Sequence, residues 1–159
     1  MSGATISRPS EAETPTRSEF PTRRAMRLER RAEVGRRARD AVSEHCAGRA
    51  ADEVIERARF VASELVTNAF EHCTTGIVTM DVSLAGESVV VTVTSPGPNH
   101  PRGIPPVNAW RIPPATNPSG RGLGMIRLVA DEVIVDAGQS PDGVHRWQAV
   151  TVFMSPDHD

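Results

Sequence analysis

The stretch SELVTNAFEHC, residues 63–73, places polar side chains along one face of a mostly apolar helix. Glu64, Asn68 and His72 are spaced four residues apart, so at about 100° per residue they drift by only about 40° per step and share a stripe. A carboxylate and an amide one turn apart suit metal-bound phosphate, because Asn offers Mg²⁺ a hard oxygen ligand and Glu can accept a proton. The stripe also fits the exposed face of an amphipathic helix, so this motif alone leaves both interpretations open.

The composition is that of an ordinary globular chain, with no overall signature of nucleic-acid or membrane binding. The chain has 159 residues, of which 38% are apolar, and its net charge is -2. No apolar run reaches the roughly 18 residues that a membrane-spanning helix needs, and the N-terminus lacks the apolar core of a signal peptide. Cys46 and Cys73 match no zinc or redox spacing. We therefore expect a cytoplasmic protein that contacts neither membrane nor nucleic acid directly.

The pattern along the chain predicts one domain behind a polar tail. Residues 1–20 are rich in Ser, Thr, Pro and Glu and are expected to be disordered, whereas residues 21–155 form a single domain. Helices are predicted from Arg23 to about Cys46 and from about Ala51 to Cys73. The segment 96–119 is dense in Pro and Gly, without periodicity, and predicts a long lid or binding loop. Alternating residues predict two hairpins, with strands at 77–84, 88–95, 132–137 and 145–153, and a short helix follows residue 120.

This order of elements predicts the fold class. Helices followed by antiparallel strands are typical of an α+β fold, here a two-layer α/β sandwich. We expect a mixed or antiparallel sheet that helices cover on one face. Because the strands come as hairpins, the right-handed crossovers of a doubly wound nucleotide-binding fold are not expected.

The first predicted helix is crowded with arginine, with eight between positions 23 and 39. One interpretation is a solvated face whose charge is partly offset by Glu29, Glu33 and Asp40. The other is a docking face for an acidic partner. The sequence leaves the two open.

A second motif, GRGLGM at residues 120–125, consists of Gly120, Arg121, Gly122, Leu123 and Gly124 before Met125. Glycines at the start of a helix let the backbone approach phosphate, and the free N–H groups there favour anions. Arg121 could add a positive charge. Alone the motif equally fits an ordinary turn, and it is not a P-loop because no Gly-Lys-Ser/Thr follows.

The third motif is VTVTSPGPNHP, residues 91–101, where a strand runs into a Pro-Gly-Pro turn. The three motifs in this order resemble the GHKL, or Bergerat-fold, ATPase and kinase superfamily. More closely, the chain is similar to the anti-sigma-factor serine/threonine kinases and their relatives in actinobacteria. The resemblance spans roughly residues 20–153, with SELVTNAFEH matching the N box of the family and GRGLGM matching its second glycine box.

The resemblance implies ATP and Mg²⁺ as cofactors and assigns roles to single positions. Glu64 would be the catalytic base, Asn68 the Mg²⁺ ligand, and His72 would lie near the phosphates or the lid. Gly97 would belong to the first glycine box, which shapes the adenine pocket. The resemblance also implies a STAS-domain anti-anti-sigma protein or a sigma factor as partner, and a homodimer. The second glycine box would close onto the phosphates through Gly120, Arg121, Gly122, Leu123 and Gly124.

One position departs from the family pattern, because Ser95 stands where the family has an Asp that accepts the adenine amino group. Ser is shorter and neutral, and a hydrogen bond to a charged group contributes about 1.5–3 kcal/mol. Two hypotheses follow. The chain is either a working Mg·ATP-dependent protein kinase with an altered base pocket, or a non-catalytic module of the same fold that binds a partner without nucleotide.

Overall fold

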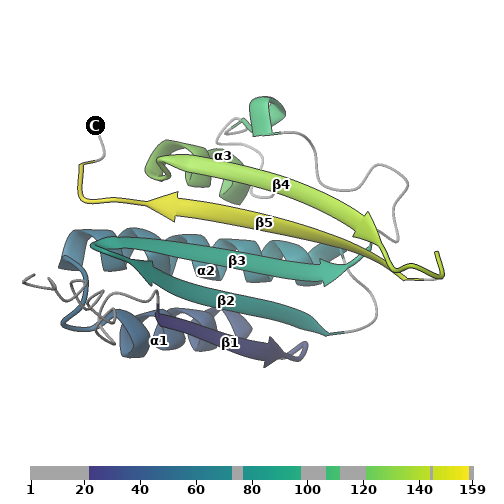
Figure 1. Cartoon of the computed structure of the whole chain (residues 1–159), viewed down its shortest axis with the longest axis horizontal. Helices are drawn as coiled ribbons and strands as arrows, with labels where there is room; N and C mark the ends of the chain where they lie inside the picture. Colours follow the sequence, from purple (N-terminus) through teal and green to yellow (C-terminus); the bar gives the residue numbers. More distant parts are fainter. Residues whose placement is uncertain (1–21, 73–76, 98–106, 112–120, 144, 158–159) are drawn as a thin grey trace, which may run out of the picture.

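The computed structural model describes residues 22–72, 77–97, 107–111, 121–143 and 145–157. Figure 1 shows one sheet with the helices gathered behind it. The elements in chain order are β1 (Thr22–Leu28), α1 (Val34–Cys46), α2 (Asp52–His72), β2 (Val78–Ala85), β3 (Ser88–Pro96), the 3-10 helix η1 (Val107–Ala109), α3 (Arg121–Val129), β4 (Glu132–Gln139) and β5 (Arg146–Met154).

The sheet of the described residues has five strands in the order β1-β2-β3-β5-β4. Every neighbouring pair is antiparallel, with Met80 of β2 opposite Val93 of β3 and Val93 opposite Val150 of β5. The helices lie on one face of this sheet (Figure 1). The predicted two-layer α/β sandwich is therefore confirmed.

The core forms where α2 crosses the middle of the sheet. Side chains of a strand alternate between its two faces, so every second residue of the central strands points toward the helices. Val89, Val91 and Val93 of β3 are buried in this way, and α2 packs against β3 as well as against α1 and α3. From α2 the buried stripe recurs at helical spacing and consists of Val54, Ile55, Ala58, Val61, Ala62, Leu65, Val66 and Phe70.

The predicted helix from Arg23 to Cys46 is wrong in nearly its first half. Residues 22–28 form strand β1 at the edge of the sheet, paired with β2, and α1 begins only at Val34. The side chains alternate along the strand. Leu28 is buried and Met26 packs against the core, whereas Arg23 and Arg27 are exposed. Arginine is a good helix former, but tertiary pairing with β2 overrides that local preference.

The two predicted hairpins are confirmed. The β2–β3 turn contains Gly86 with a φ of +61°, a left-handed conformation that favours glycine. Most of the predicted loop at 96–119 lies outside the described residues. Within it, η1 and the buried Trp110 form an ordered piece that the lack of periodicity did not predict. Among the described helices, none combines the length and apolar character needed to cross a membrane.

Candidate functional site

Glu64 and Asn68 both lie on the long helix α2, one turn apart, and both are half-buried. Neither side chain forms a hydrogen bond with another residue in the described part of the chain. His72, the last residue of α2, is exposed. The helix thus presents a carboxylate and an amide that are not committed to structural hydrogen bonds there.

The start of α3 packs directly against Glu64. A Cβ atom added at Gly122 would lie 3.3 Å from Glu64 Cδ and would clash with the carboxylate oxygen Oε2. A side chain at this position would therefore displace the Glu64 carboxylate from where it lies. The structure brings together two of the motifs singled out in the sequence, although about 60 residues separate them.

The structure describes only part of the rest of the second glycine box. Gly124 is buried within α3 and Leu123 packs against the core, whereas Gly120 lies outside the described residues. Arg121 begins the helix, and its side chain also lies outside the described part. The predicted short helix after residue 120 is confirmed.

Burial and two neighbouring charges shift the pKa of Glu64. Burial raises the pKa of its carboxyl above the ordinary value of 4.5, and the negative charge of Glu71 on the same helix raises it further. The guanidinium of Arg39, on α1, opposes both effects and lowers the pKa. The net shift is upward, in the direction expected for a carboxylate that accepts a proton during catalysis.

Arg39 is held beside α2 by a polar contact between the helices. Its Nη1 donates to Ser63 Oγ at 2.8 Å, one residue before Glu64. The helices approach closely here because Gly35 of α1 has no side chain; a Cβ there would lie 3.0 Å from Ser63 Oγ and 3.5 Å from Thr67 Oγ1. This packing fixes the positive charge of Arg39 near the carboxylate.

The far end of α2 is capped by an arginine from the β1–α1 loop. Arg30 Nη2 donates to the carbonyl oxygen of Phe70, and its guanidinium carbon lies 5.8 Å from the centre of the Phe70 ring. A cation at the last carbonyls of a helix satisfies an acceptor that lacks an intrahelical donor and stabilises the helix dipole. Arg30 therefore stabilises the turn that follows Asn68.

Ser95 and Gln148 face each other across β3 and β5 at one end of the sheet. Both follow the alternation of the buried residues Val93 and Val150, so both side chains lie on the helix-covered face. Gln148 is only 7% exposed and is the one buried polar side chain in the described core. Gln148 was not among the predicted site residues, although a polar side chain at an inward position of a strand is a signal that could have identified it.

Gly97 follows β3 directly and continues its pairing with β5. Its N–H donates to the carbonyl oxygen of Arg146, and an added Cβ would lie 2.8 Å from the Arg146 carbonyl carbon. The residue is thus a glycine because two backbones meet there. This contact keeps the strand end that carries Ser95 against the strand that carries Gln148.

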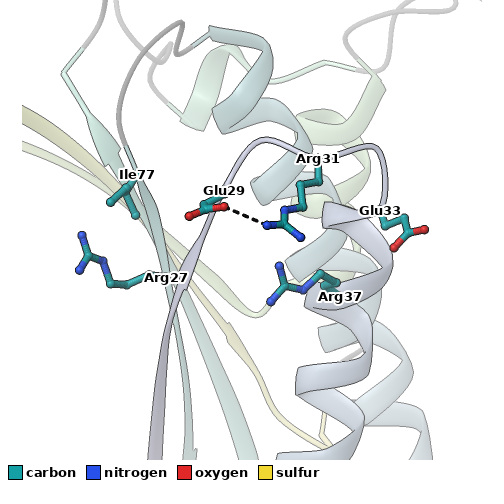
Figure 2. A pocket seen from close by; sticks show the side chains of 6 residues that line it. All are labelled: Arg27, Glu29, Arg31, Glu33, Arg37 and Ile77. Atoms are coloured by element: carbon teal, nitrogen blue, oxygen red, sulfur yellow. Dashed lines mark hydrogen bonds and ion pairs between the residues drawn. The ribbon is translucent and has the colours of Figure 1, made fainter.

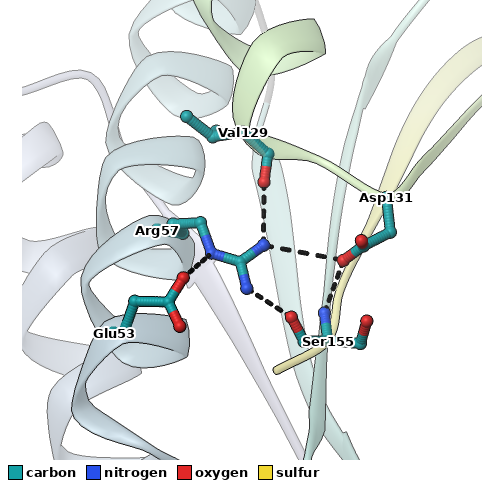
Figure 3. A network of polar contacts seen from close by, with 5 residues as sticks. All are labelled: Glu53, Arg57, Val129, Asp131 and Ser155. Carbon is teal, nitrogen blue, oxygen red and sulfur yellow. Dashed lines mark hydrogen bonds and ion pairs between the residues drawn. The ribbon is translucent and has the colours of Figure 1, made fainter. Parts of the chain in front are cut away.

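A polar network fixes the other end of α3 (Figure 3). Arg57 of α2, 10% exposed, donates through Nη1 to the carbonyl oxygen of Val129 at 3.0 Å and through Nη2 to that of Ser155. The same guanidinium pairs with Glu53 at 3.1 Å and with Asp131 at 3.6 Å. One arginine thus joins α2 to the C-terminal ends of α3 and β5.

In the described residues no group of three or more His, Cys, Asp and Glu side chains could hold a metal ion by itself. The site offers instead the carboxylate of Glu64 beside the first turn of α3, and the amide of Asn68 one turn further along α2. Mg²⁺ is commonly held by one or two protein oxygens together with substrate phosphates. The donors of Asn68 and Glu64 fit a metal that arrives with a phosphorylated ligand.

Comparison with known families agrees with this geometry. The model of the histidine kinase-like ATPase domain matches residues 28–145. The chain belongs to this family. The match covers the helix with Glu64 and Asn68, the strand end at Ser95 and the start of α3. Membership supports ATP binding at a GHKL-type site.

Solved structures support the fold. A chain in the crystal structure of the SiaB–SiaC complex from Pseudomonas aeruginosa is similar, with a TM-score of 0.56 over 82% of this chain and 89% of that chain. The sequence identity is 12%, so the likeness concerns the fold alone. No curated protein matches the chain.

Proposed function

We propose that this protein binds Mg·ATP between α2 and α3 and transfers the γ-phosphate to a Ser or Thr of a partner protein. The observation that carries the proposal is the contact between Gly122 and Glu64, which places the Gly-rich start of α3 over the half-buried carboxylate of α2. A helix start supplies N–H donors for phosphate, and a carboxylate of raised pKa suits proton transfer. The domain would be one unit of residues 21–155, acting in the cytoplasm, where ATP is available.

Each residue has a defined part in this proposal. Asn68 would hold Mg²⁺, which would neutralise phosphate charge, and the backbone of Gly122 and Gly124 would donate to phosphate oxygens with Arg121 beside them. Glu64 accepts the proton of the incoming hydroxyl. His72 is exposed at the end of α2 and would lie toward the phosphates or the lid.

The base pocket would rest on the paired residues Ser95 and Gln148. A carboxamide carries an acceptor and donors, so it can pair with the amino group and a ring nitrogen on one edge of adenine, as Gln does with adenine in DNA. Gln148 would then supply recognition that the family obtains from the Asp at the position of Ser95. Gly97 keeps the two strand ends together.

The partner is proposed to be a STAS-domain anti-anti-sigma protein, a sigma factor or both, with the kinase acting as a homodimer. The similar structure from Pseudomonas aeruginosa is a complex of two proteins, SiaB and SiaC, which supports a protein partner here. Anti-sigma kinases of the GHKL type, which the chain resembles in its N box and second glycine box, act on such partners.

The second candidate function is a non-catalytic module that binds its partner without nucleotide. Ser95 favours it, because a neutral hydroxyl replaces the charged acceptor of the family. Calorimetric titration with Mg·ATP and Mg·ADP separates the two. Micromolar binding supports the kinase, whereas no binding by this chain together with binding by Ser95→Asp supports the module.

The catalytic assignment is tested with Asn68→Ala. This variant should lose phosphate transfer to a STAS-domain substrate at saturating Mg·ATP while its melting temperature stays close to that of the parent, because Asn68 is not hydrogen bonded within the described fold. Unchanged transfer would remove Asn68 from the metal site.

A further inference from the structure

A pocket of about 640 Å³ opens at the end of β1, away from the contact between α2 and α3. Its walls come from the last residues of β1, the β1–α1 loop, the start of α1 and the residue before β2 (Figure 2). The lining residues are Arg27, Glu29, Arg31, Glu33, Arg37 and Ile77.

The pocket carries more positive than negative charge. Arg31 pairs with Glu29 at 3.2 Å, and both of these side chains are well exposed. Arg27 and Arg37 have no ion pair or side-chain hydrogen bond with any described residue. Figure 2 shows the guanidinium groups of Arg31 and Arg37 turned into the space between β1 and α1, with Arg27 across the strand beside Ile77. Two guanidinium groups are therefore available for an external anion.

Other arginines of the same segment form ion pairs or hydrogen bonds with residues of the fold. Arg24 pairs with Glu44 at 2.9 Å, Arg30 caps α2, and Arg39 donates to Ser63. The arginine-rich segment thus contains residues that join β1, α1 and α2 to one another and residues that line the pocket. Charge reversal of Arg30 would damage α2, so it would be a poor test of docking.

We propose that this arginine pocket, defined by Arg27, Arg31 and Arg37, docks a short acidic segment of a partner protein. Guanidinium groups bind carboxylates through paired N–H donors, and they are more weakly hydrated than ammonium groups. Because Glu29 and Glu33 also line the pocket, we expect only one or two carboxylates of the bound segment to contact its guanidinium groups. Ile77, 40% exposed, adds an apolar contact that a protein segment can use.

The position of the pocket links docking to the proposed catalytic helix. Arg30 stands in the chain between Glu29 and Arg31, which line the pocket, and it holds the Phe70 carbonyl two residues beyond Asn68. A partner bound here would lie next to the loop that stabilises the end of α2. The inference rests on the proposed function only in requiring a protein partner.

The test uses the full chain without nucleotide and fluorescein-labelled hexaglutamate as the probe. Anisotropy at about 50 mM salt should show binding that weakens as salt rises. Arg27→Gln/Arg37→Gln should weaken it about tenfold, since each substitution removes a cation from the pocket. The matched control Arg36→Gln/Arg49→Gln changes net charge equally outside the pocket and should bind as the parent does.

Absence of binding by the parent, or equal loss in the control pair, would overturn the inference. A thymidine oligonucleotide of the same charge serves as a comparison. If it binds more tightly than hexaglutamate and loses binding in Arg27→Gln/Arg37→Gln, the pocket binds nucleic acid and not a protein segment. Melting curves establish that both double variants fold. If the proposed kinase function is wrong but the docking proposal is right, the chain will bind hexaglutamate and will not bind ATP.

Discussion

Glu64 is a carboxylate whose surroundings disfavour its charge, and this has a consequence for stability. Its folded pKa lies above the unfolded value because of burial and of Glu71. The folded state therefore binds the proton more tightly. The protonated Glu64 side chain therefore favours the folded state. This stabilisation is fully present below the unfolded pKa and is lost as the pH rises through the folded pKa.

We therefore predict that Glu64→Gln raises the melting temperature at pH 7–8, where the parent carries the disfavoured charge. Below about pH 4 the parent is protonated and the gain should vanish. Thermal unfolding across this pH range measures the difference. Glu56→Gln on the exposed side of α2 is the control and should show no such rise. A melting temperature of Glu64→Gln equal to or below that of the parent at pH 8 would contradict the assigned shift.

Gln148 is the residue on which adenine recognition is expected to depend. Gln148→Ala should weaken Mg·ATP binding about tenfold, the effect of losing one to two hydrogen bonds. Ser95→Asp should strengthen it, and calorimetry measures both. Thr151→Ala on the outer face of β5 removes a hydroxyl that pairs with Thr92 and serves as the control for a change in the same strand. Loss of affinity for ADP and inorganic triphosphate alike would show that Gln148 does not read the base.

At the scale of elements, the contact between α2 and α3 can be tested without nucleotide. Gly122→Ala should destabilise the fold by less than about 1 kcal/mol, because its Cβ meets only the flexible end of the Glu64 side chain and Ala favours the helix more than Gly does. In a Glu64→Ala background the clash is removed and the cost of Gly122→Ala should largely disappear. Urea unfolding of the four proteins measures the coupling. Additive effects would mean that the two residues are not in contact.

The sequence predicted the elements with strong periodicity and missed those whose signal is local and weak. The stripe of α2 and the alternation of β2, β3 and β5 were sufficient to predict two layers and two hairpins. Strand β1 was missed because arginine dominates residues 22–28, and only Met26 and Leu28 mark the buried side. Pairing with β2, which is distant in sequence, determines that this segment is a strand.

The residues of the candidate site also divide into those that the sequence predicted and those that it did not. Glu64, Asn68 and Gly122 belong to motifs that are continuous in sequence, and the family resemblance implied that these motifs form one site; the structure shows the contact of Gly122 with Glu64. Gln148 belongs to no motif, and its relation to Ser95 depends on the register between β3 and β5. Arg39 likewise acts across two helices through the close approach at Gly35. Contacts of this kind are properties of packing and have no local signature.

At the scale of the whole molecule, α2 is the element to which the others attach. Arg30 holds its C-terminal end to the β1–α1 loop, Arg39 holds its middle to α1, and Arg57 holds its first half to the ends of α3 and β5. Arg57 thus fixes the last turn of α3, whereas the first turn contacts Glu64 through Gly122. Movement of α3 during nucleotide binding would therefore pivot about the end held by Arg57.

Arg57→Met tests this arrangement, because it preserves much of the side-chain volume and removes the guanidinium donors, leaving only the N–H of Ser155 to donate to Asp131. We expect a loss of about 2–4 kcal/mol, since the carbonyl groups of Val129 and Ser155 and the carboxylate of Asp131 lose a shared partner. Arg57→Lys should recover little, because one ammonium cannot reach acceptors arranged around a planar guanidinium. Hydrogen exchange should accelerate first in α3 and at the end of β5, with α1 still protected, because those ends lose their attachment to α2. Uniform acceleration across the sheet would show instead that Arg57 supports the whole core and that α3 has no separate pivot.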